Sequence, residues 1–300
     1  MPDKFIVSKN YNNSRFDKWF KEEIINLPNA LIQKLLRKNK IKVNKKKIKT
    51  SFRLSEGDEV SVFNLSNYKP TNFKKKIHYL PTSKEKRGID KIIIHDDTDY
   101  IVINKPRGIA VQSGTNNLKN IIDIFKKTKY FDYTKPYIVH RLDKETSGIF
   151  LIAKNKQAAQ FFTSLFRIRK IHKTYLAIVK GNFPKNIKKM EDFLEYFEDN
   201  KKTKLKAITF LRVLKTNSKY SLLELNPKTG RKHQIRKQLY MRGYPIIGDQ
   251  KYYLNKNKHF KDQYMLLHAY KIKFIKNNEK FNYQAQPDAD FKKKLNFYFR

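Results

Sequence analysis

The sequence predicts an α+β protein in which a small helical unit precedes a mixed, mainly antiparallel sheet with flanking helices. Residues 14–63 carry apolar side chains at helical spacing, and residues 64–90 are polar with two prolines. From residue 91 onward, short apolar runs end in polar turns, as is typical of buried strands. We therefore divide the chain into a first unit at 14–63, a linker at 64–90 and a larger domain at 91–300.

The first unit is predicted to hold two helices and a basic turn. Its first helix carries Phe16, Trp19 and Phe20 on one face and ends at Pro28. A second helix follows from residue 29 to residue 38. Residues 41–49 alternate like a strand, a turn and a strand, and residues 59–63 form a further strand.

The larger domain is predicted to alternate strands with a few helices. Strands are expected at 91–97, 100–106, 137–143, 148–155, 174–181, 207–216 and 220–227, and helices at 118–131, 157–170 and 233–243.

The charge of the chain points to a polyanionic partner. Lysine and arginine number 67 against 27 acidic residues, a formal charge of +40, although compositional bias accounts for part of it. Nucleic acid is the first candidate and an anionic membrane surface the second, but the chain lacks a basic amphipathic helix with a wide apolar face. Without cysteine it has no disulfides or cysteine metal sites. It also has no apolar run of signal or membrane-span length, so we expect a cytoplasmic protein.

The first unit gathers cations around its turn: Arg37, Lys38, Lys40, Lys42, Lys45, Lys46 and Lys47. Lysines beside a polyphosphate provide affinity with little reading of sequence. On charge alone, a solvated lysine-rich loop is an equal alternative. The order of two helices and a basic turn, with its core at 29–49, resembles the S4 RNA-binding domain.

The sharpest local signal is HRLDKETSG, residues 140–148. An apolar run places Asp143 beside Arg141, and a partly desolvated carboxylate there can act as a nucleophile or a base. For a lone aspartate after a strand, a salt bridge or a turn cap is the commoner explanation.

Two other segments carry concentrated charge. Lys105 to Gly108 follows one predicted strand, and Thr229 to Arg236 follows another and opens a helix, where an anion would bind well. A solvated Pro-Gly turn and a capped basic helix start are the structural alternatives. Lysine is the usual cation of this chain, yet arginine stands at 107, 141, 231 and 236, which indicates a need for a planar, bidentate donor.

Taken together, these segments resemble the RluA-type pseudouridine synthases, nearest to the large-subunit ribosomal RNA branch represented by RluC. The HRLDxxTSG motif falls on His140 to Gly148, KPxG on Lys105 to Gly108 and TGRxHQIR on Thr229 to Arg236. The KxY element falls on Lys173 to Tyr175, and a Gly-Asp turn on Gly248 and Asp249. Gln112 and Gln238 depart from the histidines common in relatives, which puts the target in question rather than the reaction.

The resemblance implies isomerisation of uridine to pseudouridine without a cofactor or metal. It makes Asp143 an ionised nucleophile toward the sugar or the base, paired with Arg236. Tyr175 would pack on the uracil and could assist late proton removal, Ile235 would wall the base, and Arg141 would enter the space left by the flipped nucleotide. Further RNA contacts are expected from Lys105, Arg107, His140, Lys173, Arg231, His233 and Gln234. An ordinary strand aromatic and a core residue remain the alternatives for Tyr175 and Ile235.

The leading hypothesis is therefore a monomeric synthase that modifies large-subunit ribosomal RNA. The alternative is a non-catalytic RNA-binding or ribosome-assembly protein on the same scaffold. The completeness of the motifs argues against a decayed site.

Overall fold

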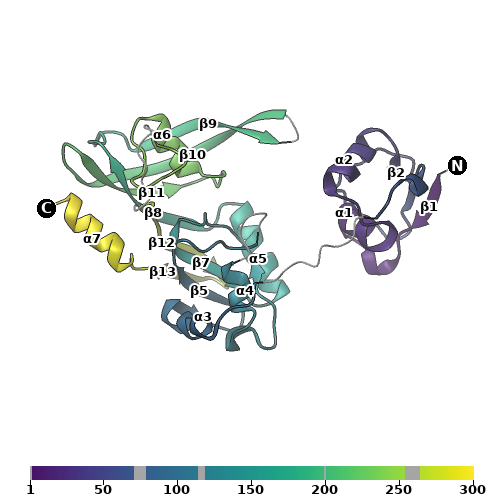
Figure 1. The fold of residues 1–300 in the computed structure, drawn as a ribbon, viewed down its shortest axis with the longest axis horizontal. Helices are drawn as coiled ribbons and strands as arrows, with labels where there is room; N and C mark the ends of the chain where they lie inside the picture. The colour runs from purple at the N-terminus through teal and green to yellow at the C-terminus, as the bar shows by residue number, and fades with distance from the viewer. Residues whose placement is uncertain (1, 71–78, 114–118, 199–200, 254–263) are drawn as a thin grey trace. The chain divides into compact units, whose positions relative to one another are not determined.

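The computed structural model describes residues 2–70, 79–113, 119–198, 201–253 and 264–300. The chain divides into two compact units, residues 1–77 and 78–300, which are described separately (Figure 1).

The first unit is a three-stranded antiparallel sheet, in the order β1-β3-β2, with short helices. Its elements are β1 (Asp3–Ile6), α1 (Phe16–Trp19), a π-helical turn (Phe20–Ile24), α2 (Asn29–Arg37), β2 (Ile41–Val43) and β3 (Glu59–Val62), with 3-10 turns at Lys9–Tyr11 and Leu65–Asn67. Phe16, Trp19 and Phe20 are buried with Ile32 and Leu36 of α2, which confirms the predicted apolar faces.

This unit differs from the prediction at three places. The first helix ends at Ile24 rather than at Pro28, because Ile25 is extended, and its second half is the π-helical turn. The unit begins before residue 14, because β1 pairs with β3. The second strand predicted within 41–49 is absent: Val43 and Lys46 exchange both backbone hydrogen bonds around Asn44 and Lys45, whose φ angles are 47° and 62°. This two-residue turn closes on a single bridge, so no strand follows it.

The second unit is built on a ten-stranded sheet in the order β4-β5-β7-β12-β8-β11-β10-β9, with β6 beside β7 and β13 beside β12. The strands are β4 (Ile93–Asp96), β5 (Tyr100–Lys105), β6 (Tyr137–Ile138), β7 (Ser147–Ala153), β8 (His172–Lys180), β9 (Lys189–Glu198), β10 (Lys201–Thr216), β11 (Tyr220–Pro227), β12 (Leu267–Lys276) and β13 (Glu279–Gln284). Strands β7 and β12 pair in parallel and the other described pairs are antiparallel, so the predicted mixed, mainly antiparallel sheet is confirmed.

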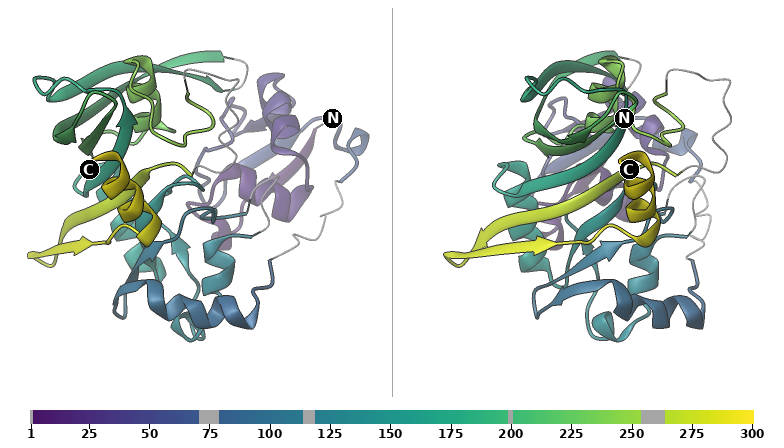
Figure 2. Two further views of the ribbon diagram at one scale, coloured as in Figure 1. Left: turned by 60° about the vertical axis from the view of Figure 1, so that its left-hand side comes forward. Right: turned by 90° about the vertical axis from the view of Figure 1, so that its left-hand side faces the viewer.

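Helices cover both faces of this sheet (Figures 1 and 2). They are α3 (Ser83–Gly88), α4 (Ile121–Phe125), α5 (Lys156–Arg167), α6 (Gln234–Met241) and α7 (Ala289–Tyr298). Along β5, Ile101 and Ile103 pack with α4, whereas Tyr100 and Val102 pack with α5, so these helices lie on opposite faces. In the same way, α6 covers the face of β8 that carries Ala177, and α7 covers the face that carries Ile178.

The loop that carries Asp143 begins earlier than predicted, because β6 has only two residues. One edge of β7 is shared: β6 pairs with Ile152 and Ala153, and β12 pairs with Ser147 and Gly148. Since β12 occupies the part of this edge toward which β6 runs, the segment after Ile138 must leave the sheet. Residues 139–146 therefore form the loop. Asp143 lies in this loop and not in a strand, although we predicted a strand over 137–143.

Several elements were not predicted. Helix α3 lies within the predicted linker, where Thr82 and Glu85 form a capping box. Strands β9, β12 and β13 and helix α7 are also additional. The helix predicted at 118–131 is α4 followed by a 3-10 turn at Lys129–Phe131, and residue 118 lies outside the described residues. In the ranges given above, no helix is both long and apolar enough to span a bilayer.

Candidate active site

Segments distant in the sequence meet at a cavity of about 130 Å³ in the second unit. The loop after β6 contributes Asp143, the beginning of β8 contributes Tyr175, and the beginning of α6 contributes Ile235 and Arg236. Most of the site residues predicted in the second unit therefore come together, with Arg141, Lys173, Arg231, His233 and Gln234 also in the lining.

Asp143 and Arg236 form the central ion pair. Nη1 of Arg236 donates to Oδ2 of Asp143 at 2.8 Å, as we predicted. Arg236 is only 8% exposed. Burial alone would lower the pKa of Arg236, but hydrogen bonds and charge from Asp249, and then from Asp143, raise it above its ordinary value. The guanidinium is thus a permanent cation beside the candidate nucleophile.

Asp249 fixes the orientation of this guanidinium. Its two carboxylate oxygens accept from Nε and Nη2 of Arg236 at 2.7 and 2.8 Å, a bidentate arrangement that leaves Nη1 for Asp143. Asp249 is 1% exposed and also accepts from the backbone N–H groups of Lys251 and Tyr252. Sequence reasoning found the Gly-Asp turn but assigned it no role, since nothing local indicates a partner 13 residues away.

His233 approaches Asp143 from the other side. Its Nε2 lies 3.6 Å from Oδ1 of Asp143, and its Nδ1 lies 3.0 Å from the hydroxyl of Tyr252. Burial lowers the pKa of His233 more than the charge of Asp143 raises it, so the ring is neutral at pH 7. The guanidinium of Arg236 faces the Tyr252 ring at 5.1 Å. Sequence reasoning missed Tyr252 because it lies outside the motifs.

Tyr175 and Ile235 form the apolar side of the cavity. Tyr175 pairs with Leu225 and Ala269 on neighbouring strands, and Ile235 packs against the same face of the sheet. Burial, followed by the charge of Asp143, raises the pKa of Tyr175, so its phenol is protonated at neutral pH. Both residues are partly core residues and partly lining, which combines the two explanations considered for them.

Arg141 and Lys173 line this cavity and a larger neighbouring pocket. Arg141 is exposed and forms no ion pair with any residue that the structure describes. Burial lowers the pKa of Lys173. Arg231 also lines the cavity and donates from Nε to the carbonyl of Lys206 at 3.2 Å.

Lys105, for which we predicted an RNA contact, lies inside the protein. It is fully buried, and its ammonium group donates to the carbonyls of Pro106, Ile109 and Lys144. Burial lowers the pKa of Lys105 to about 7. Because Lys144 follows Asp143, the hydrogen bond from Lys105 to the Lys144 carbonyl helps to fix the loop that carries Asp143.

Gln234 is also engaged within the protein rather than free for RNA. It is 5% exposed, and its amide oxygen accepts from the hydroxyl of Thr229 and the backbone N–H of Arg231. Its amide nitrogen donates to the carbonyl of Ile208 and the hydroxyl of Thr209. The side chain thereby fastens the beginning of α6 to β10.

Arg107 and His140 likewise have partners inside the unit. Arg107 pairs with Asp288 at 2.8 Å and with Asp290, and its guanidinium lies 3.4 Å from the centre of the Tyr264 ring. His140 accepts at Nε2 from the backbone N–H of Leu151, and burial lowers its pKa to about 3. Arg107 thus links the KPRG loop to the start of α7, a role that sequence reasoning could not assign.

The predicted cations of the first unit surround its turn. Arg37, Lys38, Lys45, Lys46 and Lys47 are exposed, and Lys40 and Lys42 are half-buried. No ion pair among the described residues includes any of these seven. The turn is therefore a cluster of unneutralised charge.

A profile of the RNA pseudouridylate synthase family matches residues 99–240, which hold Asp143, Tyr175 and Arg236. The chain is 32% identical to the ribosomal large subunit pseudouridine synthase C of Buchnera aphidicola, over 97% of this chain and 95% of the relative. It is 35% identical to the protein of the same name in Rickettsia conorii, over 96% of this chain and 95% of the relative.

The chain belongs to the RNA pseudouridine synthase family. It is an enzyme that isomerises uridine to pseudouridine in RNA. Human RNA pseudouridylate synthase domain containing 4 has the same fold, with a TM-score of 0.59 and 26% identity over 70% of this chain and 94% of that one. In pseudouridine the uracil is joined to the sugar by a C–C bond instead of the C–N bond of uridine. The enzyme must therefore break one glycosidic bond and form another, and it must hold the detached uracil in between.

Proposed function

We propose that this synthase modifies the large-subunit ribosomal RNA and uses Asp143 as its nucleophile. The observation that carries the proposal is the Asp143 carboxylate, held by a buried guanidinium that Asp249 orients. The names of the relatives, which cover nearly the whole chain, support the class of RNA.

In the proposed reaction, ionised Asp143 attacks the target nucleotide at the sugar or the base. The bond between C1′ and N1 breaks, the uracil rotates, and a bond forms between C1′ and C5. The bond between Asp143 and the nucleotide also breaks, which returns the carboxylate. The proton on C5 is lost and N1 gains one, so that substrate and product have the same composition. Arg236 keeps the carboxylate charged and oriented toward the nucleotide. Because the reaction is an isomerisation, it consumes no co-substrate.

The residues around Asp143 have supporting roles in this proposal. The ring of Tyr175 supplies a flat contact for the uracil, and Ile235 supplies an apolar one. Tyr175 would also serve in late proton removal, for which its phenol, whose pKa burial raises, must first lose its own proton. Arg141, exposed at the rim, would occupy the space left by the flipped nucleotide.

The first unit is proposed to act as an S4-like RNA grip. Its two helices and basic turn present seven cations without acidic partners among the described residues, which suits contact with phosphates. The linker between the units, a cytoplasmic location and a monomeric state remain predictions.

The test is Asp143→Asn in the full-length protein, assayed for pseudouridine in an unmodified large-subunit RNA transcript. We expect activity to fall by at least about 10³-fold, because an amide is a far weaker nucleophile than a carboxylate. Asp192→Asn is the matched control, since Asp192 pairs with Arg242, the residue just after α6, and does not line the cavity. Full activity of Asp143→Asn would disprove the assignment.

The ribosome-assembly alternative makes a different prediction. A deletion strain rescued equally by the wild type and by Asp143→Asn would favour it for the cellular role. Rescue by Asp192→Asn and failure of Asp143→Asn would favour catalysis.

A further inference from the structure

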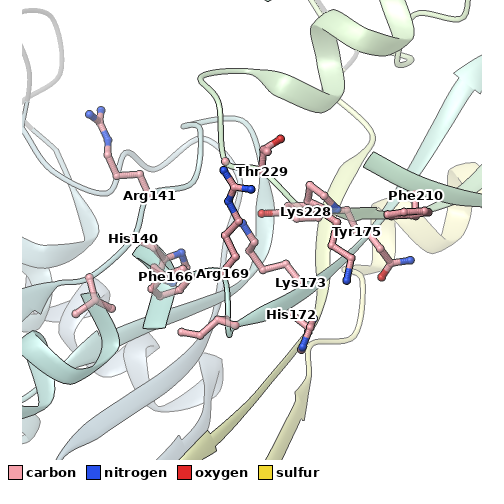
Figure 3. A pocket seen from close by; sticks show the side chains of 15 residues that line it. His140, Arg141, Phe166, Arg169, His172, Lys173, Tyr175, Phe210, Lys228 and Thr229 are labelled. Carbon is pink, nitrogen blue, oxygen red and sulfur yellow. The ribbon is translucent and has the colours of Figure 1, made fainter. Parts of the chain in front are cut away.

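A second pocket, with a volume of about 670 Å³, adjoins the candidate active site (Figure 3). The two pockets share Arg141, Lys173, Tyr175, Pro227, Thr229 and Gly230. Its further walls come from the end of α5, at Phe166 and Arg169, and from β10 and the residue after β11, at Phe210 and Lys228. An RNA strand that leaves the first cavity can therefore enter the second directly.

The lining of this pocket carries positive charge without a carboxylate. Arg141, Arg169, Lys173 and Lys228 all line it, and none of the 15 lining residues is acidic. Within the described part of the chain these four cations make no ion pair. The contrast with β9 and β10 is clear, where Lys189 and Lys206 pair with Glu191, and Lys202 pairs with Glu195. An anion inside this pocket would meet cations that pair with no described carboxylate.

Arg169 is held in a conformation that arginine does not favour. Its φ is +61°, in the left-handed region just after α5, where glycine or asparagine costs less. Among the described non-glycine residues with positive φ, the others are asparagine, apart from His233 beside Asp143 and Lys45 in the basic turn. Strained backbone often marks a functional position, and the use of arginine here indicates that its side chain is needed.

The pocket also offers aromatic surface. Phe210 is 41% exposed, and Lys228 lies 5.9 Å from its ring centre. On the opposite side, Phe166 stacks on His140 with 4.6 Å between ring centres. Figure 3 shows Arg169 and Lys173 between these two aromatic walls. Cations combined with an exposed ring match the needs of one unstacked nucleotide, whose phosphate and base both require a partner.

We propose that this pocket binds a nucleotide next to the target uridine in the same RNA strand. Arg169, Lys173 and Lys228 bind its phosphate, and Phe210 stacks on its base. The inference rests on the proposed function of the Asp143 cavity, because the shared residues make the two pockets contiguous. It adds a subsite that selects single-stranded RNA around the target.

The protein variants for the test are Arg169→Asn and Lys228→Gln in the full chain. Asparagine keeps the left-handed turn without strain while the charge is removed, so Arg169→Asn should fold at least as well as the wild type. We expect each variant to raise KM for RNA about tenfold, with kcat changed less than about twofold. Lys280→Gln, an exposed change of the same charge on β13, is the control. KM values equal to that of the control would overturn the proposal.

Altered RNAs identify what the pocket binds. After the target uridine is mapped, short RNAs carry an abasic residue or a neutral methylphosphonate at each neighbouring position. At one position, the wild type should lose about tenfold in kcat/KM for each change. Arg169→Asn should lose less from the methylphosphonate, because only Lys173 and Lys228 remain to contact that phosphate. Equal losses in the wild type and in Arg169→Asn at every position would overturn the subsite. A wild type that modifies no large-subunit transcript would instead disprove the proposed function.

Discussion

The two basic regions of this protein use positive charge in opposite ways. Around Asp143, one buried arginine is shared by two carboxylates and held by three hydrogen bonds. In the first unit, Lys45, Lys46 and Lys47 are exposed and have no acidic partner among the described residues. Catalysis requires one charge in one place, whereas retention of a polyanion requires many charges without fixed geometry. Substitutions should therefore be severe in the first region and mild in the second.

Beyond Asp143→Asn, the largest effect is expected from Arg236→Lys. A lysine cannot hold Asp249 with two donors while it also reaches Asp143, so the carboxylate would lose its orientation. We expect kcat to fall between about 10²- and 10³-fold in a single-turnover assay. Arg242→Lys, which alters the bidentate pair between Asp192 of β9 and the residue just after α6, should lose little activity. Similar losses in both variants would show that the helix, rather than the guanidinium geometry, determines activity.

The packing of β7 against β12, next to the loop that carries Asp143, is expected to be sensitive as well. A Cβ at Gly148 would lie 2.2 Å from the carbonyl oxygen of Ala269 on β12, and the φ of Gly148 is +105°. Gly148→Ala should destabilise the protein by about 3 kcal/mol in urea unfolding, because β7 and β12 must separate. Gly243→Ala has a similar φ problem at +79° with open space around it, so about 1 kcal/mol is expected. Equal losses would contradict the close approach.

Buried Lys105 should show a pH dependence that sharpens the contrast with exposed lysines. Its pKa is about 7 in the folded protein against an ordinary 10.5, so the unfolded chain binds more protons between these values. Stability contributed through Lys105 therefore rises with pH in this window. The unfolding free energy of the wild type minus that of Lys105→Met should increase by about 2 kcal/mol from pH 7.5 to 9.5. A constant or shrinking difference would contradict burial of a titrating group.

The smallest effect is expected from the basic turn. Lys45→Gln combined with Lys46→Gln should weaken RNA binding a few-fold, and the slope of log affinity against log salt should fall by about 1.5. The measurement is a filter-binding titration at several salt concentrations. Lys280→Gln with Lys292→Gln, two exposed changes on the second unit, is the matched control. An unchanged slope would show that the turn does not contact phosphates.

The sequence predicted the strands and helices with strong periodicity, and it predicted the site where motifs were contiguous. β5, β7, α5 and α6 lie where the apolar patterns place them. The elements it missed, such as β9 and β13, intersperse their aromatic residues with charged and amide residues in place of an apolar run. Their pairing with neighbouring strands overrides a weak local preference.

By itself, the sequence determined which side chains were available. These are one carboxylate in HRLD, arginines within the motifs of a chain whose usual cation is lysine, and a cluster of lysines in the first unit. Only the tertiary structure decided how they are used. It brings Asp249 and Tyr252 to Arg236, and it buries Lys105 and Gln234, which sequence reasoning had assigned to RNA. It also opens a cationic pocket beside the Asp143 cavity. Burial and partnership depend on which strands share an edge, and that pairing joins residues too far apart in the chain for any local pattern to record.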